Sequence, residues 1–241
     1  MYSFTTKVRF SEVDVNKILT VNSLINYFQD CSTFHSEDVG LGFSYLNSVN
    51  RVWLMISWQV KINRLPGFGE EVEIGTWPYE FKGMYGKRIF TLKEAKTGEM
   101  LAYANSIWCY ADDKTFVPAK ILPENTAGYE MEPPLEMEEM GRKIPLPEGM
   151  VEKSAFTVDY AALDCNKHVN NGQYIRMAMD YLPDGFEVGG FMAEYKKMAF
   201  LGDTVIPKVA SDETSYTVAL TSSEGSVYTT VKFFKKQESL K

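Results

Sequence analysis

The chain has 241 residues, of which 45% are hydrophobic, and its formal net charge is −7. This length suits one large domain or two of about 110–120 residues, and the apolar fraction excludes a wholly disordered chain. The negative charge argues against nucleic acid as the main partner, because binding to phosphates depends on a basic surface. No stretch resembles a membrane span or a secretory signal, and the three scattered cysteines favour reduced thiols, so we predict a cytoplasmic protein.

The first half reads as one helix followed by strands. Apolar residues at spacings of three to four within 24–34 predict an amphipathic helix, which Thr20 can cap. His35 continues this spacing, so we predict a helix-end residue rather than a ligand. Four runs rich in β-branched and aromatic residues then predict strands at 52–62, 71–78, 84–93 and 100–110.

A proline-rich connector separates the two halves. Residues 118–148 hold six of the ten prolines and an acidic run at 130–139, which is typical of an exposed segment draped over a surface.

The second half repeats the plan of the first. A helix is predicted to begin after Asn170 and to stop near Pro183, and strands are predicted at 190–200, 203–210, 215–221 and 226–235. A helix wrapped by a curved antiparallel sheet buries the apolar faces of both elements. We therefore predict an α+β protein of two tandem hot-dog domains, 1–122 and 150–241, joined by a connector at 123–149.

An internal repeat marks the start of each predicted helix. The string Asp-x-Asn-Lys begins at Asp14 and again at Asp164, an offset of 150 residues (164 minus 14). Asp and Asn side chains often shape turns, so the shared residues indicate a structural role in both halves. Only the second copy continues to a histidine, His168, where the first has Ile18. Because imidazole transfers protons near neutral pH, only the second half is equipped for base chemistry.

Three motifs extend over nearly the whole chain. They are Gly75-Thr76-Trp77-Pro78 with Arg88 and 98–108, Asp164-x-Asn166-x-His168-Val169-Asn170-Asn171, and Glu194-Tyr195-Lys196-Lys197 with Gly202-Asp203-Thr204-Val205. With these motifs in this order, the chain resembles the acyl-ACP thioesterases of plants and bacteria.

The resemblance implies hydrolysis of a fatty acyl thioester on acyl carrier protein, as in fatty acid biosynthesis. It implies catalytic roles for Asp164, Asn166 and His168, an acyl pocket supplied mostly by the first domain, and no metal or organic cofactor. Plant members carry a Glu-Cys pair where this chain has Met198-Ala199. Glu194 is a weak substitute for that pair. On a strand it would share a face with Met198 but lie two steps away from it.

The residues suggest a mechanism of their own. His168 would activate water, Asn166 would orient that water or hydrogen-bond the carbonyl, and Asp164 would orient its neighbours or make the imidazole more basic. The backbone at Val169 and Asn170, where the second helix begins, would stabilise the oxyanion.

Other interpretations stay open. His168 could merely cap a helix, and Cys165 reads as a small buried loop residue rather than a nucleophile. Lys196 and Lys197 read as a solvated strand edge that could touch a carrier. The alternatives to the predicted activity are an acyl-CoA thioesterase, a hot-dog dehydratase or hydratase, and a non-catalytic acyl-binding module. A monomer and a homodimer are both compatible with two hot-dogs in one chain.

Overall fold

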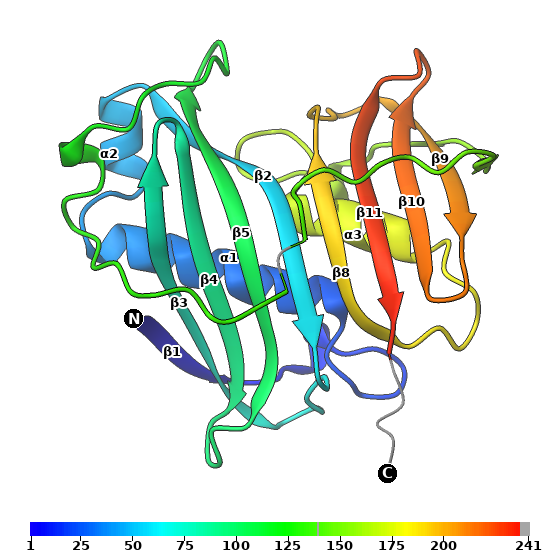
Figure 1. Ribbon diagram of the computed structural model, residues 1–241, viewed down its shortest axis with the longest axis horizontal. Helices are drawn as coiled ribbons and strands as arrows, with labels where there is room; N and C mark the ends of the chain where they lie inside the picture. The colour runs from blue at the N-terminus through cyan, green and yellow to red at the C-terminus, as the bar shows by residue number, and fades with distance from the viewer. Residues whose placement is uncertain (139, 237–241) are drawn as a thin grey trace. The chain divides into compact units, whose positions relative to one another are not determined.

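The computed structural model describes residues 1–138 and 140–236. Glu139, which ends the predicted acidic run, and residues 237–241 of the predicted second domain lie outside this part. The chain divides into two compact units. Unit 1 comprises Met1–Ile56 and Ile62–Glu139, and unit 2 comprises Ser57–Lys61 and Met140–Lys241. In Figure 1 the chain runs from blue in unit 1 to red in unit 2.

Unit 1 is an antiparallel sheet with one long helix. The strands lie in the order β1, β3, β4, β5 and β2, and each of the first four pairs with the next. Their bounds are Tyr2–Lys7 for β1, Arg51–Ile62 for β2, Glu71–Lys82 for β3, Tyr85–Glu94 for β4 and Met100–Asp112 for β5. The helices are α1, Val21–Asp38, and the short α2, Phe43–Ser48.

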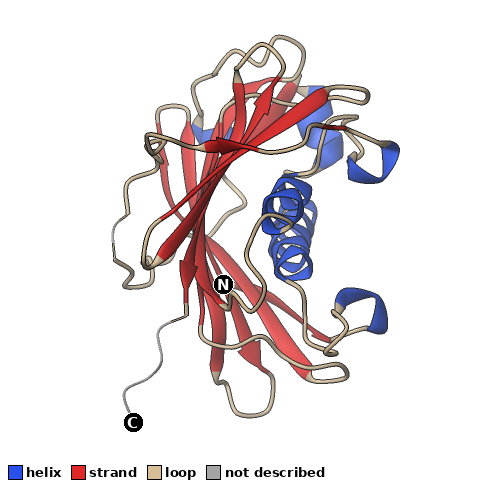
Figure 2. Cartoon of the chain, turned by 90° about the vertical axis from the view of Figure 1, so that its right-hand side faces the viewer, coloured by secondary structure: helices blue, strands red, loops and turns tan. Residues whose placement is uncertain are grey.

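Helix α1 begins as the sequence indicates and buries its apolar side. The Thr20 hydroxyl accepts a hydrogen bond from the Ser23 N–H at 3.1 Å, which caps the first turn. Leu24, Ile25 and Phe28 are fully buried, and the Phe28 ring lies 5.3 Å from that of Phe90 in β4. In each unit the helix covers one face of its own sheet (Figure 2), so side chains between helix and sheet form the core.

Unit 2 repeats the plan with a shorter helix, α3, Asn171–Met179. Residues 57–61 of β2 pair with β8, and the order then continues through β11, β10 and β9, all antiparallel. The bounds are Val188–Tyr195 for β8, Thr204–Ser211 for β9, Ser215–Ser222 for β10 and Val227–Lys235 for β11, with β6, Val151–Glu152, and β7, Phe156–Thr157, on β9.

One glycine allows close approach within unit 2. A Cβ added at Gly190 in β8 would lie 2.6 Å from the Val60 carbonyl oxygen in β2, which is closer than side chains tolerate. Only glycine therefore fits this position of the β2–β8 pair.

The predicted α+β hot-dog architecture is confirmed, with differences in its elements. Helix α3 has nine residues and is not long, and β8 ends at Tyr195 rather than at 200. Strand β3 continues past Pro78, because the ladder shifts register between Pro78 and Glu80 and the proline occupies this irregularity. Strand β1 was not predicted, since its six residues alternate between half-buried and exposed and include few apolar side chains.

The connector is fixed to each unit by polar contacts. In unit 1 the Trp77 indole N–H donates to the Pro133 carbonyl at 2.9 Å, and in unit 2 the Ile144 N–H donates to Glu194 at 3.0 Å. Most connector residues are exposed, but Ile144 is buried. The predicted domain boundaries at 122 and 149 stay predictions. None of the helices in the described residues is both long and apolar enough to cross a bilayer.

Candidate active site

The Asp-x-Asn-Lys string in unit 2 forms a closed loop. The Asp164 N–H donates to the His168 carbonyl at 3.0 Å, and the Lys167 N–H donates back to the Asp164 carbonyl at 3.0 Å. Asp164 Oδ1 also accepts from the Asn166 N–H at 2.8 Å. Lys167 adopts a left-handed conformation with φ 65°, which turns the chain back on itself.

Unit 1 contains the same loop around Asp14. The Asp14 N–H donates to the Ile18 carbonyl at 2.8 Å, Asp14 Oδ1 accepts from the Asn16 N–H at 2.9 Å, and Lys17 has φ 62°. The loop therefore forms whether its fifth residue is Ile18 or His168. This identity supports the predicted structural role of the shared Asp and Asn.

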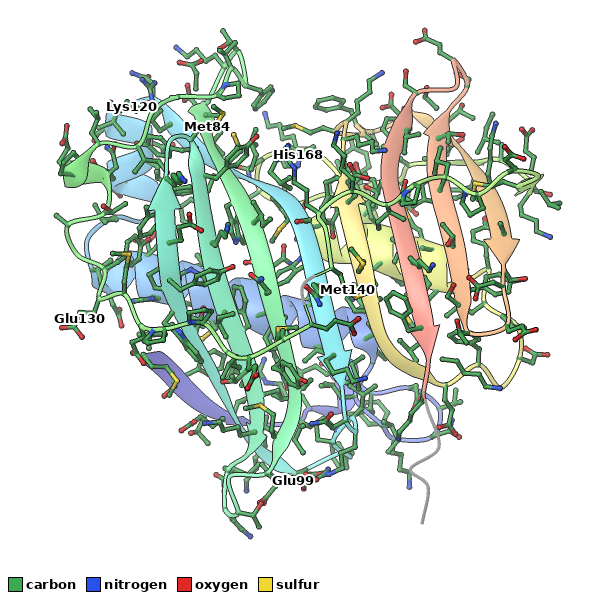
Figure 3. The ribbon with its side chains drawn as sticks, viewed as in Figure 1. Met84, Glu99, Lys120, Glu130, Met140 and His168 are labelled. Carbon is green, nitrogen blue, oxygen red and sulfur yellow. The ribbon has the colours of Figure 1, made fainter. Side chains whose placement is uncertain are left out.

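The loop places His168 beside the end of β8, as Figure 3 shows. The backbone of His168 forms an isolated antiparallel β-bridge with that of Phe200. The His168 side chain is 16% exposed. The His168 Nδ1 atom lies 3.5 Å from Asp164 Oδ2, too long for a good hydrogen bond but close enough for electrostatic attraction. The structure thus brings together two predicted residues, His168 and Asp164. The third, Asn166, is exposed, and its contact with Asp164 uses its backbone N–H.

The predicted oxyanion role of Val169 and Asn170 is not supported by their hydrogen bonds. The Val169 N–H donates to the Ala199 carbonyl, and the Asn170 N–H donates to the Ala162 carbonyl, both at 2.9 Å. The Asn170 side chain instead caps α3 by accepting from the Gly172 N–H at 2.8 Å. Neither predicted amide is available to a substrate unless the loop rearranges.

A buried tyrosine holds the backbone segment to which the loop is hydrogen-bonded. The Tyr174 hydroxyl in α3 accepts from the Ala199 N–H at 2.8 Å, next to the carbonyl that holds Val169. Burial raises the pKa of Tyr174 above its usual value, so the hydroxyl stays protonated. From the sequence, Tyr174 falls within the helix predicted between Asn170 and Pro183 and has no assigned role. A tyrosine on a buried face needs a partner for its hydroxyl, and this requirement was the available signal.

Two models of known protein families match the chain, one in each half. The family model for the acyl-ACP thioesterase N-terminal domain matches residues 1–129, and the model for the acyl-ACP thioesterase C-terminal domain matches residues 147–233. The chain belongs to the acyl-ACP thioesterase family.

Curated proteins that resemble this chain are acyl carrier protein thioesterases and hydrolases. The palmitoyl-acyl carrier protein thioesterase of Gossypium hirsutum is 27% identical over 216 residues, covering 82% of this chain and 52% of that protein. Acyl-[acyl-carrier-protein] hydrolase FATB2 of Cuphea viscosissima is 29% identical over 194 residues, covering 73% and 46%. Both are described as chloroplastic, and this chain spans about half the length of the curated relatives it matches.

Two solved structures share the fold. An acyl-ACP thioesterase from Bacteroides thetaiotaomicron superposes with a TM-score of 0.88 at 23% identity, covering 97% of both chains. The 12:0-ACP thioesterase from Umbellularia californica gives a TM-score of 0.87 at 20% identity, covering 98% of this chain and 97% of the other. At these identities the likeness concerns the fold.

The two positions where the resemblance implies a Glu-Cys pair in plant members are occupied here by Met198 and Ala199. Met198 is half-buried and Ala199 is fully buried, beyond the end of β8. Glu194 and Met198 do not share a strand face as predicted, because β8 ends at Tyr195. Glu194 accepts from the Ile144 N–H and lies 3.3 Å from the Lys196 amine, so its carboxylate holds the connector.

The remaining side chains of the loop are solvent-facing. Cys165 is exposed at the loop tip, so its prediction as a small buried residue is wrong. Within residues 1–138 and 140–236, no three His, Cys, Asp or Glu side chains are grouped so that they could hold a metal ion.

The second histidine of this thioesterase family member lies in unit 1, in the last turn of α1 as predicted. The His35 ring is buried and stacks on Tyr2, with centroids 5.1 Å apart and planes 7° apart. Its Nδ1 atom lies 3.0 Å from Arg88 Nη1, and the Tyr129 ring meets it edge-on at 5.1 Å. Burial and the Arg88 charge lower the pKa of His35 to about 4, so the ring is neutral at pH 7.

We expect His35 to make stability depend on pH. An unfolded histidine has a pKa of about 6.5, so between pH 6.5 and pH 4 the unfolded chain binds more protons than the folded one. The contribution of His35 to the free energy of unfolding should therefore fall by about 2 kcal/mol from pH 7 to pH 4, after a reduction for solvent screening. Urea unfolding of the wild type and of His35→Gln at both pH values measures this. An equal pH dependence in the two proteins would contradict the assignment.

Proposed function

We propose that this chain hydrolyses fatty acyl thioesters carried on acyl carrier protein, releasing a free fatty acid and the carrier thiol. The observation that carries the proposal is the His168–Asp164 pair, 3.5 Å apart in the loop that precedes α3. The same loop in unit 1 has Asp14 but no imidazole. Of the two loops, only the one in unit 2 therefore carries a side chain that can act as a general base, His168.

The proposed reaction runs through a tetrahedral intermediate. His168 removes a proton from water as the water oxygen attacks the thioester carbonyl carbon. Asp164 Oδ2, 3.5 Å from Nδ1, orients the imidazole and stabilises its charged form. The C–S bond then breaks, and the imidazolium returns the proton to the departing thiolate. The products are the carboxylic acid and the thiol.

Asn166 is our candidate donor to the developing oxyanion. The amides of Val169 and Asn170 are already engaged, whereas the Asn166 side chain is exposed at the same loop. Its amide N–H₂ can hydrogen-bond a carbonyl oxygen as that atom gains charge.

Exposed lysines near the loop favour a carrier protein over coenzyme A. The chain's net charge of −7 would repel an acidic carrier, but Lys167 follows Asn166 directly, and Lys196 and Lys197 follow the end of β8. A local basic surface steers an acidic partner even on a negatively charged protein. The cytoplasmic location and the choice between monomer and homodimer stay predictions.

Thiol release from matched acyl-ACP and acyl-CoA substrates, C8 to C18, tests this function. We expect kcat/KM to be at least about tenfold higher for acyl-ACP at low salt, and the preference to shrink as salt screens the lysines. If the protein instead prefers acyl-CoA and salt does not change this preference, coenzyme A is the carrier of the substrate and the proposed hydrolysis mechanism still holds. Absence of turnover on every substrate would leave an acyl-binding module instead.

A further inference from the structure

In unit 2, the turn at residues 199–203 provides the backbone partners of His168 and its neighbour. The Phe200 backbone forms the β-bridge with His168, and the Ala199 carbonyl accepts from the Val169 N–H at 2.9 Å. The backbone position of His168 therefore depends on where this turn lies. The proposed hydrolysis gives no role to the side chains that hold the turn in place.

Asp203 closes the turn with its backbone and with its side chain. Its N–H donates to the Phe200 carbonyl at 3.1 Å, and its Oδ2 atom accepts from the Phe200 N–H at 3.0 Å. The same oxygen accepts from the Tyr228 hydroxyl at 3.2 Å. Tyr228 is buried in β11, and burial together with the Asp203 charge raises the pKa of its hydroxyl, which stays protonated and donates. Two donors thus fix the carboxylate that holds the Phe200 amide.

Unit 1 has the same turn at residues 66–70, held by different side chains. Gly67 forms the bridge with Ile18. The Glu70 N–H donates to the Gly67 carbonyl at 3.1 Å, and Glu70 Oε2 accepts from the Gly67 N–H at 3.0 Å. Glu70 Oε1 lies 2.7 Å from Nη2 of Arg64, whose side chain is 37% exposed. An exposed ion pair is screened by water and uses a long side chain, so it holds the turn less firmly than a buried hydroxyl does.

Two tyrosine hydroxyls contact the turn of unit 2 at positions where unit 1 has leucines. The carbonyls of Leu101 and Tyr228 each accept from two successive backbone N–H groups that follow the preceding strand, so these residues occupy equivalent places. Leu24 lies 150 residues before Tyr174, the offset of the two loops (174 minus 24), and the Tyr174 hydroxyl accepts from the turn. Hydroxyls therefore replace hydrocarbon groups in the unit whose loop has the histidine.

We propose that Asp203 and Tyr228 are positioning residues for His168, which hold the turn so that the imidazole meets the attacking water in a reactive orientation. This inference rests on the proposed hydrolysis. A displacement of about 1 Å in a reacting group can lower a rate about 100-fold, so the turn beside a general base must be fixed. The turn in unit 1 supports Ile18, which transfers no proton, and the same precision is not needed there.

Steady-state hydrolysis of acyl-ACP by the full chain tests this role. We expect Asp203→Ala to lower kcat about 10- to 100-fold and to change KM less than about threefold, because the orientation of the base affects the transition state and not substrate binding. Asp203→Asn retains an oxygen that accepts from Phe200, so its kcat should stay within about threefold of wild type. Tyr228→Phe removes only the hydroxyl and should lower kcat about three- to tenfold.

Glu70→Ala is the matched control, because it removes the same hydrogen bond from the same turn in unit 1. Its kcat should stay within about threefold of wild type, since that turn positions no proton-transferring residue. Urea unfolding shows whether each variant is folded under assay conditions, and Tyr228→Phe decides the matter if Asp203→Ala is not. An equal fall in kcat for Glu70→Ala and Asp203→Ala would overturn the proposal, and so would wild-type kcat in Tyr228→Phe.

NMR of the histidine rings separates this proposal from the hydrolysis itself. The chain has two histidines, so the signal that disappears in His168→Ala belongs to His168. Asp203→Ala should move this signal and leave that of His35, in unit 1, unchanged. If the wild type hydrolyses no thioester, the proposed function fails and the NMR comparison still tests the positioning. A His168 signal that does not move in Asp203→Ala would overturn it.

Discussion

The His168→Ala variant is expected to lower kcat/KM for acyl thioesters by about 10²–10⁴-fold, the range by which a positioned general base accelerates proton transfer. The variant should stay folded, because the loop does not depend on the imidazole. Unit 1 forms the same loop with Ile18 in this position, held by Asp14 and by its own backbone. Thiol release with a defined acyl-ACP measures the rate, and circular dichroism monitors the fold.

Lys167→Ala is the matched control for this experiment. It changes the neighbouring residue in the same loop, whose side chain is exposed, and leaves Asp164 and His168 in place. We expect its effect on hydrolysis of a short acyl-CoA to be less than about threefold, because its charge bears on the carrier protein rather than on the thioester. Wild-type activity in His168→Ala would remove this residue from the mechanism.

Phe90→Ala is expected to destabilise unit 1 by about 4 kcal/mol. The side chain is fully buried between β4 and α1, and its ring contacts that of Phe28 at 5.3 Å. Truncation removes apolar surface from the core and leaves a cavity that the surrounding helix and sheet fill only partly. Urea unfolding followed by tryptophan fluorescence suits this test, since Trp53, Trp77 and Trp108 belong to unit 1 and only Trp58 to unit 2.

Phe10→Ala serves as the comparison for the core variant. Phe10 is 83% exposed, so its truncation should change the free energy of unfolding by about 0.5 kcal/mol or less. Two units can unfold separately, and the fit then needs two transitions. A loss below about 1 kcal/mol for Phe90→Ala would mean that the α1–sheet core is not what stabilises unit 1.

Local patterns predicted most of the architecture. The three-to-four spacing within 24–34 and the alternating strands sufficed for α1 and for the main strands, because each depends on side chains close in the sequence. The predicted end of β8 was wrong. The apolar residues Met198, Ala199 and Phe200 were read as part of the strand, but the strand ends at Tyr195, before the exposed Lys196 and Lys197, and the backbone beyond it turns so that the Ala199 carbonyl accepts from Val169.

The site was predictable in its residue types and less so in its hydrogen bonds. The repeat at Asp14 and Asp164 identified the loop, and the histidine identified the proton carrier. The amides of Val169 and Asn170 have partners at Ala199 and Ala162, and their choice depends on how three separate segments meet. The pairing of His35 with Arg88 likewise joins residues 53 positions apart.

The two copies of the loop have the same backbone and different residues at their fifth position. In a homodimer of single hot-dog domains, one gene encodes both copies, so every substitution appears twice. In this chain Ile18 and His168 are encoded separately, and either can change while the other is conserved. Because both hot-dog units are encoded in one chain, one unit can lack the histidine and adapt to other ligands while the other unit retains it.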